Sequence, residues 1–127
     1  MHTFMDRDAF GRLVGIEAVF IEPGRARMRL DPDDRHRNGL GMVHGGALFT
    51  LADLALAAAS NAGDHSAVAI NAGMTFVKPG RKGPLFAEAR ELSAGRTIAA
   101  YAVDVTDEGG ALLATFTATV YRREKKA

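Results

Sequence analysis

The most unusual residue for chemistry is Asp53, a carboxylate within the apolar stretch Ala47–Ala59. The side chains within one helical turn of it cannot neutralise a charge: Phe49, Thr50, Leu56 and Ala57. An ionised carboxylate is costly to bury without partners, so this position needs an explanation. Asp53 is either a nucleophile or general base in an apolar cleft, or a structural residue bonded to a backbone amide of a neighbouring element.

A second group of candidates directly precedes this stretch, in the segment Asn38–Gly46. Gly45 and Gly46 stand where a helix is predicted to begin, and the first amides of a helix have no partner within it. Glycines there allow a substrate to approach the bare backbone, which suggests an oxyanion hole; a tight turn explains them equally well. His44 is a candidate catalytic residue or a residue that orders the loop. Asn38 is a turn residue or an amide donor to a bound carbonyl.

Several common kinds of site are excluded by the residue types. The chain has no Cys, which removes thiolate metal sites, iron–sulfur clusters and cysteine nucleophiles. His2, His36 and His65 show no ligand spacing with His44, so we expect no metal. The nucleophile elbow of serine hydrolases, the phosphate-binding P-loop and the dinucleotide fingerprint are all missing.

Composition narrows the class of protein further. The 127 residues are 47% hydrophobic and 24% charged, which predicts one globular domain over 1–127. The formal charge of +1 does not suggest a nucleic-acid partner. The start of the chain shows no signal peptide, and the longest apolar stretch is too short to span a membrane, so we expect a cytoplasmic protein.

The elements that must position the candidates follow from hydrophobic spacing. A helix from Gly45 to roughly Ala62 is apolar nearly all round, so it must be buried and wrapped by other elements. A short helical segment precedes it at Asp6–Val14. Alternation predicts six strands: Ile16–Ile21, Arg25–Leu30, Ala67–Val77, Leu85–Leu92, Thr97–Thr106 and Ala111–Tyr121. In the third strand the alternation predicts one shared face for Val68, Ile70, Ala72, Met74 and Phe76. The fold class is α+β, with a curved, mostly antiparallel sheet of about six strands around one long central helix.

The motif Asn38-x-x-Gly41-x-x-His44-Gly45-Gly46, followed by Phe49-x-Leu51-Ala52-Asp53 and Asn61, closely resembles the PaaI-type branch of the hotdog-fold acyl-CoA thioesterases. The resemblance extends to Phe10-Gly11-x-Leu13-x-Gly15-Ile16 and to Phe76-Val77-Lys78-Pro79-Gly80, and so covers nearly the whole chain.

The resemblance implies hydrolysis of an acyl-CoA thioester to a free acid and coenzyme A, without a metal or redox cofactor. It assigns the catalytic carboxylate to Asp53, the amide that polarises the thioester carbonyl to Gly45, and the assisting side-chain amide to Asn38. Some relatives carry a hydroxyl one turn after the carboxylate, where this chain has Ala57.

The basic residues Lys78, Arg81 and Lys82 surround Pro79-Gly80 and are either a docking surface for the phosphates of coenzyme A or a solvated hairpin tip. The resemblance favours phenylacetyl-CoA or a hydroxylated arylacetyl-CoA as substrate, with medium-chain acyl-CoA as the alternative. Two other functions stay open. A dehydratase or hydratase of acyl thioesters would need His44 as its acid or base, and a non-enzymatic acyl-CoA binder would have no use for the Asp53 charge.

The spacing of the two main candidates predicts an oligomer. Asp53 lies eight residues after Gly45, which is about 12 Å along a helix at about 1.5 Å per residue. Both groups must reach one thioester, so one helix cannot supply them both. We expect a homo-oligomer, at least a dimer and in the fullest form a homotetramer, whose sites combine Gly45 and Asn38 of one subunit with Asp53 of the other.

Overall fold

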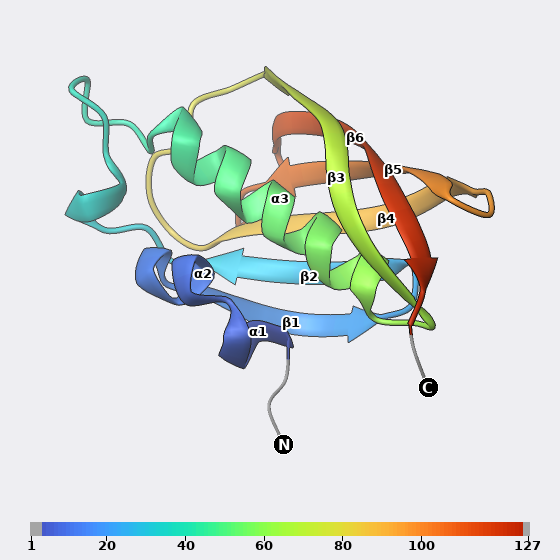
Figure 1. Ribbon diagram of the computed structural model, residues 1–127. Helices are drawn as coiled ribbons and strands as arrows, with labels where there is room; N and C mark the ends of the chain where they lie inside the picture. The colour runs from blue at the N-terminus through green and yellow to red at the C-terminus, as the bar shows by residue number, and fades with distance from the viewer. Residues whose placement is uncertain (1–3, 126–127) are drawn as a thin grey trace.

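The computed structural model describes residues 4–125, which form one antiparallel sheet curved around a long helix (Figure 1). The sheet has six strands in the order β1-β2-β4-β5-β6-β3. The strands are β1 (Ile16–Glu22), β2 (Arg25–Leu30), β3 (His65–Phe76), β4 (Leu85–Ala94), β5 (Ile98–Thr106) and β6 (Leu112–Glu124). The helical elements are α1 (Phe4–Arg7), α2 (Ala9–Val14), the 3-10 turn η1 (Asp34–His36) and α3 (Gly45–Asn61). The predicted hotdog architecture, with six strands and one long helix, is confirmed.

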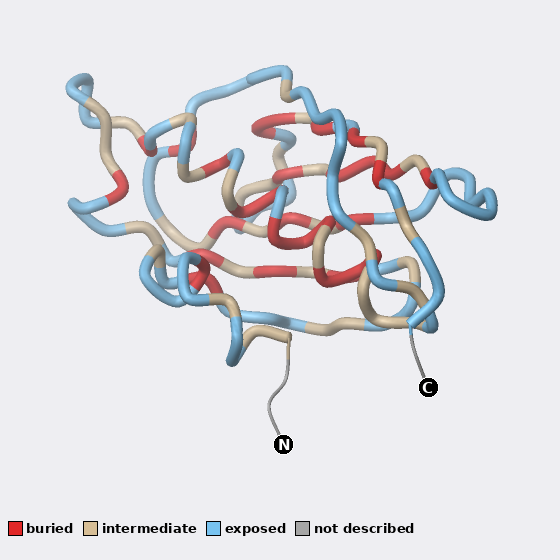
Figure 2. The backbone as a smooth tube through the Cα atoms, viewed as in Figure 1, coloured by how far each residue is buried: buried red, intermediate tan, exposed pale blue. Residues whose placement is uncertain are grey.

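Helix α3 lies against the concave face of the sheet because its side chains are small or aliphatic on that side. The residues that contact the sheet are fully buried, among them Leu51, Ala52 and Ala55. Facing them are Met28 and Phe116, which are also buried. Figure 2 shows this core as a buried band through α3 and the middle strands, while β3 and the loop before α3 are mainly exposed.

The prediction that α3 is buried all round is wrong. One face of the helix carries the exposed residues Gly46, Phe49 and Asp53, with Thr50 and Ala57 half-buried beside them. These positions recur every three or four residues, so they form one stripe along the helix. The sheet covers the opposite side of the helix fully and this stripe only in part, since the ring of Phe49 still packs edge to face on Phe116 of β6, with ring centroids 5.1 Å apart. Asp53 therefore lies at the surface of the single chain, and its charge does not need a buried partner there.

Strand β3 departs from the predicted alternation in its first half. Val68 pairs with the exposed Tyr121 on the outer face of the sheet, whereas Ala72 pairs with the buried Ala118 on the helix side. A bulge between Ala69 and Asn71 inserts one extra residue, and this reverses which side chains face the helix. The shared face predicted for the whole strand is therefore correct only after the bulge.

The remaining differences concern element ends. The predicted helical segment Asp6–Val14 is two short helices, because Asp8 caps the second by accepting a hydrogen bond from the Gly11 amide at 2.7 Å. The strand predicted at Leu85–Leu92 continues to Ala94. Within residues 4–125, none of the helices combines the length and hydrophobicity needed to cross a bilayer.

Candidate active site

The start of α3 leaves one backbone amide free. Gly46 donates its N–H to Nδ1 of His44 at 2.8 Å, and the amides of Ala47 and Leu48 donate to the His44 carbonyl. The amide of Gly45 has no acceptor among the residues that the structure describes. This N–H lies at the positive end of the helix dipole, where a developing negative oxygen is stabilised. The backbone therefore presents one free N–H group at the start of α3, at the glycine that the motif indicates.

His44 is the N-cap residue of α3. Because its Nδ1 accepts the Gly46 amide, the proton of the neutral ring lies on Nε2. Its own amide donates to the His36 carbonyl. His44 therefore orders the start of the helix. The hydrogen bond to its Nδ1 occupies the amide of Gly46, a residue for which the sequence predicted a role in substrate binding.

Asn38 is a turn residue, which is one of the two roles that its sequence position suggested. Its Oδ1 accepts the amides of Leu40 at 2.9 Å and Met42 at 3.1 Å, which closes a turn in the loop before α3. This fixes the orientation of the side-chain amide, and within residues 4–125 its Nδ2 donates to no acceptor. Asn38 is therefore a turn residue whose free N–H group is held in one orientation.

A cavity of about 370 Å³ joins these donors to the basic loop. Asn38 and Gly45 line it together with Phe76, whose ring would lie 3.1 Å from a Cβ placed on Gly45. A side chain at position 45 would have to displace this ring slightly, so glycine lets the ring lie close to the start of α3. Lys78 lines the same cavity, while Arg81 and Lys82 lie farther along the loop. The predicted donors and one of the predicted cations thus share one cavity.

Asp53 lies in a different cavity, also of about 370 Å³, between α3 and β3. At about 1.5 Å per residue, the eight residues between Gly45 and Asp53 separate them by about 12 Å along the axis. Partial burial among apolar side chains raises the pKa of Asp53, and the carboxylate of Asp8 raises it further. Asp8 is close because α2 packs tightly on α3: a Cβ on Gly11 would lie 2.6 Å from Cδ2 of Leu54.

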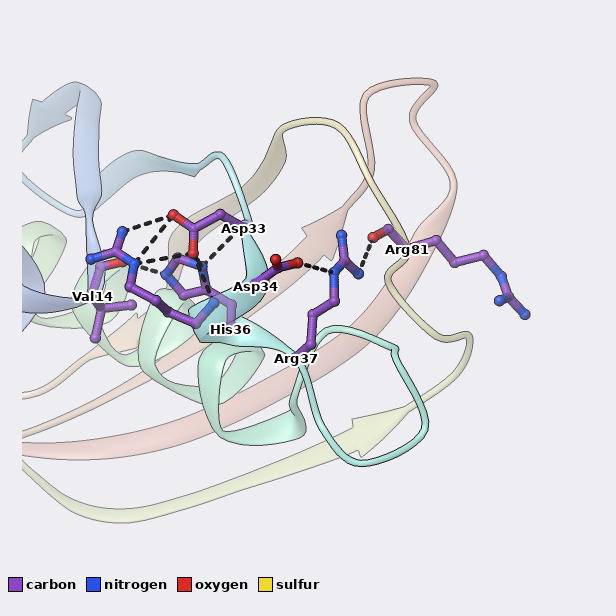
Figure 3. A network of polar contacts seen from close by, with 7 residues as sticks. Val14, Asp33, Asp34, His36, Arg37 and Arg81 are labelled. Atoms are coloured by element: carbon purple, nitrogen blue, oxygen red, sulfur yellow. Dashed lines mark hydrogen bonds and ion pairs between the residues drawn. The ribbon is translucent and has the colours of Figure 1, made fainter.

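Two residues that the sequence did not single out hold the loop in place (Figure 3). The buried ring of His36 accepts the Asp33 amide at Nδ1 and donates from Nε2 to the Val14 carbonyl, which ties the loop to the end of α2. Arg37 donates to the carbonyls of Gly41 and Arg81, at 3.1 and 2.6 Å. These bonds join the loop before α3 to the basic loop. A histidine followed by arginine in a polar segment gives no periodic signal, so spacing could not reveal either role.

The family of the chain follows from comparison with known proteins. The sequence profile described as "Thioesterase superfamily" matches residues 40–114. The acyl-coenzyme A thioesterase PaaI of Escherichia coli is 30% identical over 122 residues, which cover 95% of this chain and 87% of that protein. The chain belongs to the thioesterase superfamily. The PaaI-type resemblance, the hotdog fold and the assignment as a thioester hydrolase are confirmed.

Solved structures agree with this assignment. The structure of E. coli PaaI superposes on this thioesterase with a TM-score of 0.89 and 29% identity, covering 93% of this chain and 86% of that one. A protein from Thermus thermophilus gives a TM-score of 0.85 and 38% identity, with 91% and 97% covered. A protein from Streptococcus mutans, solved bound to acetyl CoA, gives 0.82 and 26%, with 88% and 91% covered.

The described part of this thioesterase contains no group of three His, Asp or Glu side chains placed to hold a metal ion. The side chains and backbone at the two cavities offer a carboxylate, an oriented amide side chain, a free helix amide and the lysine Lys78. Such groups serve attack on a carbonyl and stabilisation of the oxyanion that results.

The ring of His36 generates the first prediction. In His36→Leu the Asp33 amide and the Val14 carbonyl lose their partner, the buried His36 ring, and losing two part-buried hydrogen bonds costs about 1–3 kcal/mol. We expect a lower free energy of unfolding in urea. The same substitution at His65, whose ring makes no hydrogen bond within residues 4–125, is the matched control. Equal destabilisation by the two substitutions would show that the His36 bonds do not hold the loop.

Proposed function

We propose that this thioesterase hydrolyses an acyl-CoA, with phenylacetyl-CoA or a hydroxylated arylacetyl-CoA as substrate, and that Gly45, Asn38 and Asp53 carry the reaction. The observation that carries the proposal is that Gly45, with a free amide, and Asn38, with a free Nδ2, line one cavity. Two donors that line one cavity suit the oxygen of a thioester carbonyl. The E. coli relative is an acyl-coenzyme A thioesterase, and the S. mutans relative was solved with acetyl CoA.

In the proposed reaction the thioester oxygen accepts hydrogen bonds from Gly45 and Asn38. Asp53 either attacks the carbonyl carbon itself or removes a proton from the water that attacks it. The tetrahedral oxyanion collapses, the carbon–sulfur bond breaks, and the thiolate of coenzyme A leaves and takes up a proton. If Asp53 is the nucleophile, water then cleaves the resulting anhydride. In both routes the products are a carboxylic acid and free coenzyme A.

The substrate is proposed to lie between the two cavities. Lys78 lines the cavity of the donors, so it is the cation best placed for a phosphate of coenzyme A, with Arg81 and Lys82 farther along the same loop. The acyl group then lies in the apolar cavity beside Asp53.

The site is proposed to be complete only in a dimer, because the single chain holds Gly45 and Asp53 about 12 Å apart along α3. Strand β3 supports this proposal. It pairs with β6 alone, so its other edge has no partner strand within residues 4–125, and it exposes Val68 at 64% and Ile70 at 58%. A long apolar edge strand is a natural pairing surface for a second copy. Assembly to a homotetramer and a cytoplasmic location stay predictions.

The alternative functions have less support. A dehydratase or hydratase would use His44 as its acid or base, but Nδ1 of His44 already accepts the Gly46 amide. A protein that only binds acyl-CoA would gain nothing from a carboxylate at the edge of an apolar cavity.

Replacing Asp53 by Asn tests the proposed reaction. Release of free thiol from a panel of acyl-CoAs should fall by at least about 100-fold in kcat, with a small change in KM, because the shape is kept and the carboxylate is lost. Asp104→Asn, on the outer face of β5, is the control and should retain full activity. If Asp53→Asn kept more than about a tenth of the wild-type kcat, Asp53 would be a structural residue.

The electrostatics of Asp53 predict a pH effect. Asp53 must be ionised to act, so kcat/KM should fall at acid pH. Because the pKa of Asp53 is raised, this fall should occur at a higher pH than the ordinary pKa of an Asp carboxyl would give. Asp8→Asn removes one cause of the shift but retains the helix cap. The acid limb should therefore move to lower pH in this variant. An identical limb in Asp8→Asn and wild type would contradict the influence of Asp8 on Asp53.

Subunit mixing tests the composite site. Asn38→Asp removes the N–H donor while keeping an acceptor for the Leu40 and Met42 amides, and Asp53→Asn removes the carboxylate. When the two inactive proteins are dissociated and re-mixed in equal amounts, each heterodimer has one intact site. Since about half of the dimers are then heterodimers, about a quarter of wild-type activity should return. Absence of recovery after demonstrated subunit exchange would place all three groups of each site in one chain.

A further inference from the structure

We propose that Ser60 is a specificity-determining residue that accepts a hydrogen bond from a hydroxyl on the acyl group. The inference rests on the proposed function, since it concerns the cavity in which the acyl group would lie beside Asp53. It narrows the substrate class to acyl groups that carry a hydroxyl at the end remote from the thioester.

The wall of this cavity is mainly apolar. Phe4, Leu56 and Val120 line it, together with small residues of α3 and β3. The side chain of Asn61 also lines it, but both N–H groups donate, to the carbonyls of Ala57 and Ala67, and its oxygen accepts the Ala67 amide. Asn61 therefore has no donor left for a ligand, and its oxygen already accepts one amide. Apart from Asp53, Ser60 and this oxygen, the cavity offers a bound acyl group little but apolar contact.

Ser60 is the exception in this wall. Its exposure is 8%, and it is one of two buried polar residues, with His36, in the part of the chain that the structure describes. Its hydroxyl donates a long hydrogen bond of 3.4 Å to the Ala57 carbonyl, which leaves the lone pairs of Oγ available. A ligand hydroxyl that enters an apolar cavity needs an acceptor, since burying it unpaired is unfavourable. Ser60 can supply that acceptor.

The spacing along α3 sets the length of the acyl group. Ser60 lies seven residues after Asp53, which is nearly two full helical turns, so both side chains lie on the same side of the helix. The separation along the axis is about 10.5 Å at about 1.5 Å per residue. An acyl carbon attacked at Asp53 therefore carries a group that extends along α3 toward Ser60. An aryl ring one carbon from the carbonyl, with its hydroxyl on the far side, fits this direction.

Ser60 also borders a second, polar cavity of about 320 Å³ lined by Glu91 and Tyr101. The Tyr101 hydroxyl donates to Glu91 at 3.0 Å, so these two groups satisfy each other. A purely structural Ser60 would serve the packing between the two cavities. Its loss would then affect hydrolysis of every acyl-CoA alike, which separates that role from recognition of a substrate hydroxyl.

The test compares matched substrates. We would measure kcat/KM by thiol release for phenylacetyl-CoA and for its 3-hydroxy and 4-hydroxy forms, with wild type, Ser60→Ala and Ser66→Ala. Ser66 is exposed on β3 and is the control for loss of a serine hydroxyl. In Ser60→Ala the ratio of hydroxylated to unsubstituted substrate should fall about 10-fold for at least one isomer, and in Ser66→Ala it should not change.

The outcomes separate this inference from the proposed function. An unchanged ratio in Ser60→Ala, or an equal fall in Ser66→Ala, would overturn the role of Ser60 while the thioesterase activity stands. Hydrolysis confined to straight-chain acyl-CoAs would overturn it too. Absence of thiol release from every acyl-CoA with wild-type protein would instead overturn the proposed function itself.

Discussion

The rigidity of α3 constrains everything else in this molecule. A helix fixes the distance between its first amide and any later side chain, so the free N–H of Gly45 and the carboxylate of Asp53 cannot approach each other within one chain. A reaction that needs both must bring a second helix into place. The exposed edge of β3 and the exposed stripe on α3 are the surfaces through which a second copy could do so. The catalytic proposal and the dimer proposal therefore depend on the same geometry.

The two proposed oxyanion donors would have to be held still before substrate arrives, since donors that reorganise during a reaction stabilise its transition state less. Three interactions outside the reacting atoms achieve this. His44 caps α3 and occupies the amide of Gly46, the turn of Asn38 orients its own side chain, and the ring of His36 joins the loop to the end of α2. These hydrogen bonds pair other polar groups of the loop with partners in the protein. They leave the two proposed donors, the Gly45 amide and Nδ2 of Asn38, free.

The fold could be predicted because the spacing of apolar residues is periodic in strands and helices, and this spacing located the six strands and α3 closely. The prediction failed where a local feature of the backbone or of the packing is not visible in that spacing. The bulge at Ile70 reversed the faces of β3, and a helix rich in small apolar residues looked buried all round although one stripe remains exposed. The loop was harder still. The sequence left two roles open for Asn38. The structure shows a turn that fixes the orientation of its side-chain amide, and residue spacing cannot predict such a turn.

The small residues of α3 connect these observations. Ala52, Ala55 and Ala59 are buried and let the sheet approach the helix closely, whereas Ala57 faces the other way and leaves room beside Asp53. The carboxylate of Asp53 has few polar neighbours, so its pKa is raised even though the side chain reaches solvent. A second copy covering this stripe would remove more water and raise the pKa further. The proposed reaction needs this charge, so in the proposed dimer the cavity would have to remain partly open or receive polar contacts from the partner. The charge that Asp53 must carry would therefore limit how completely a second copy can cover the cavity.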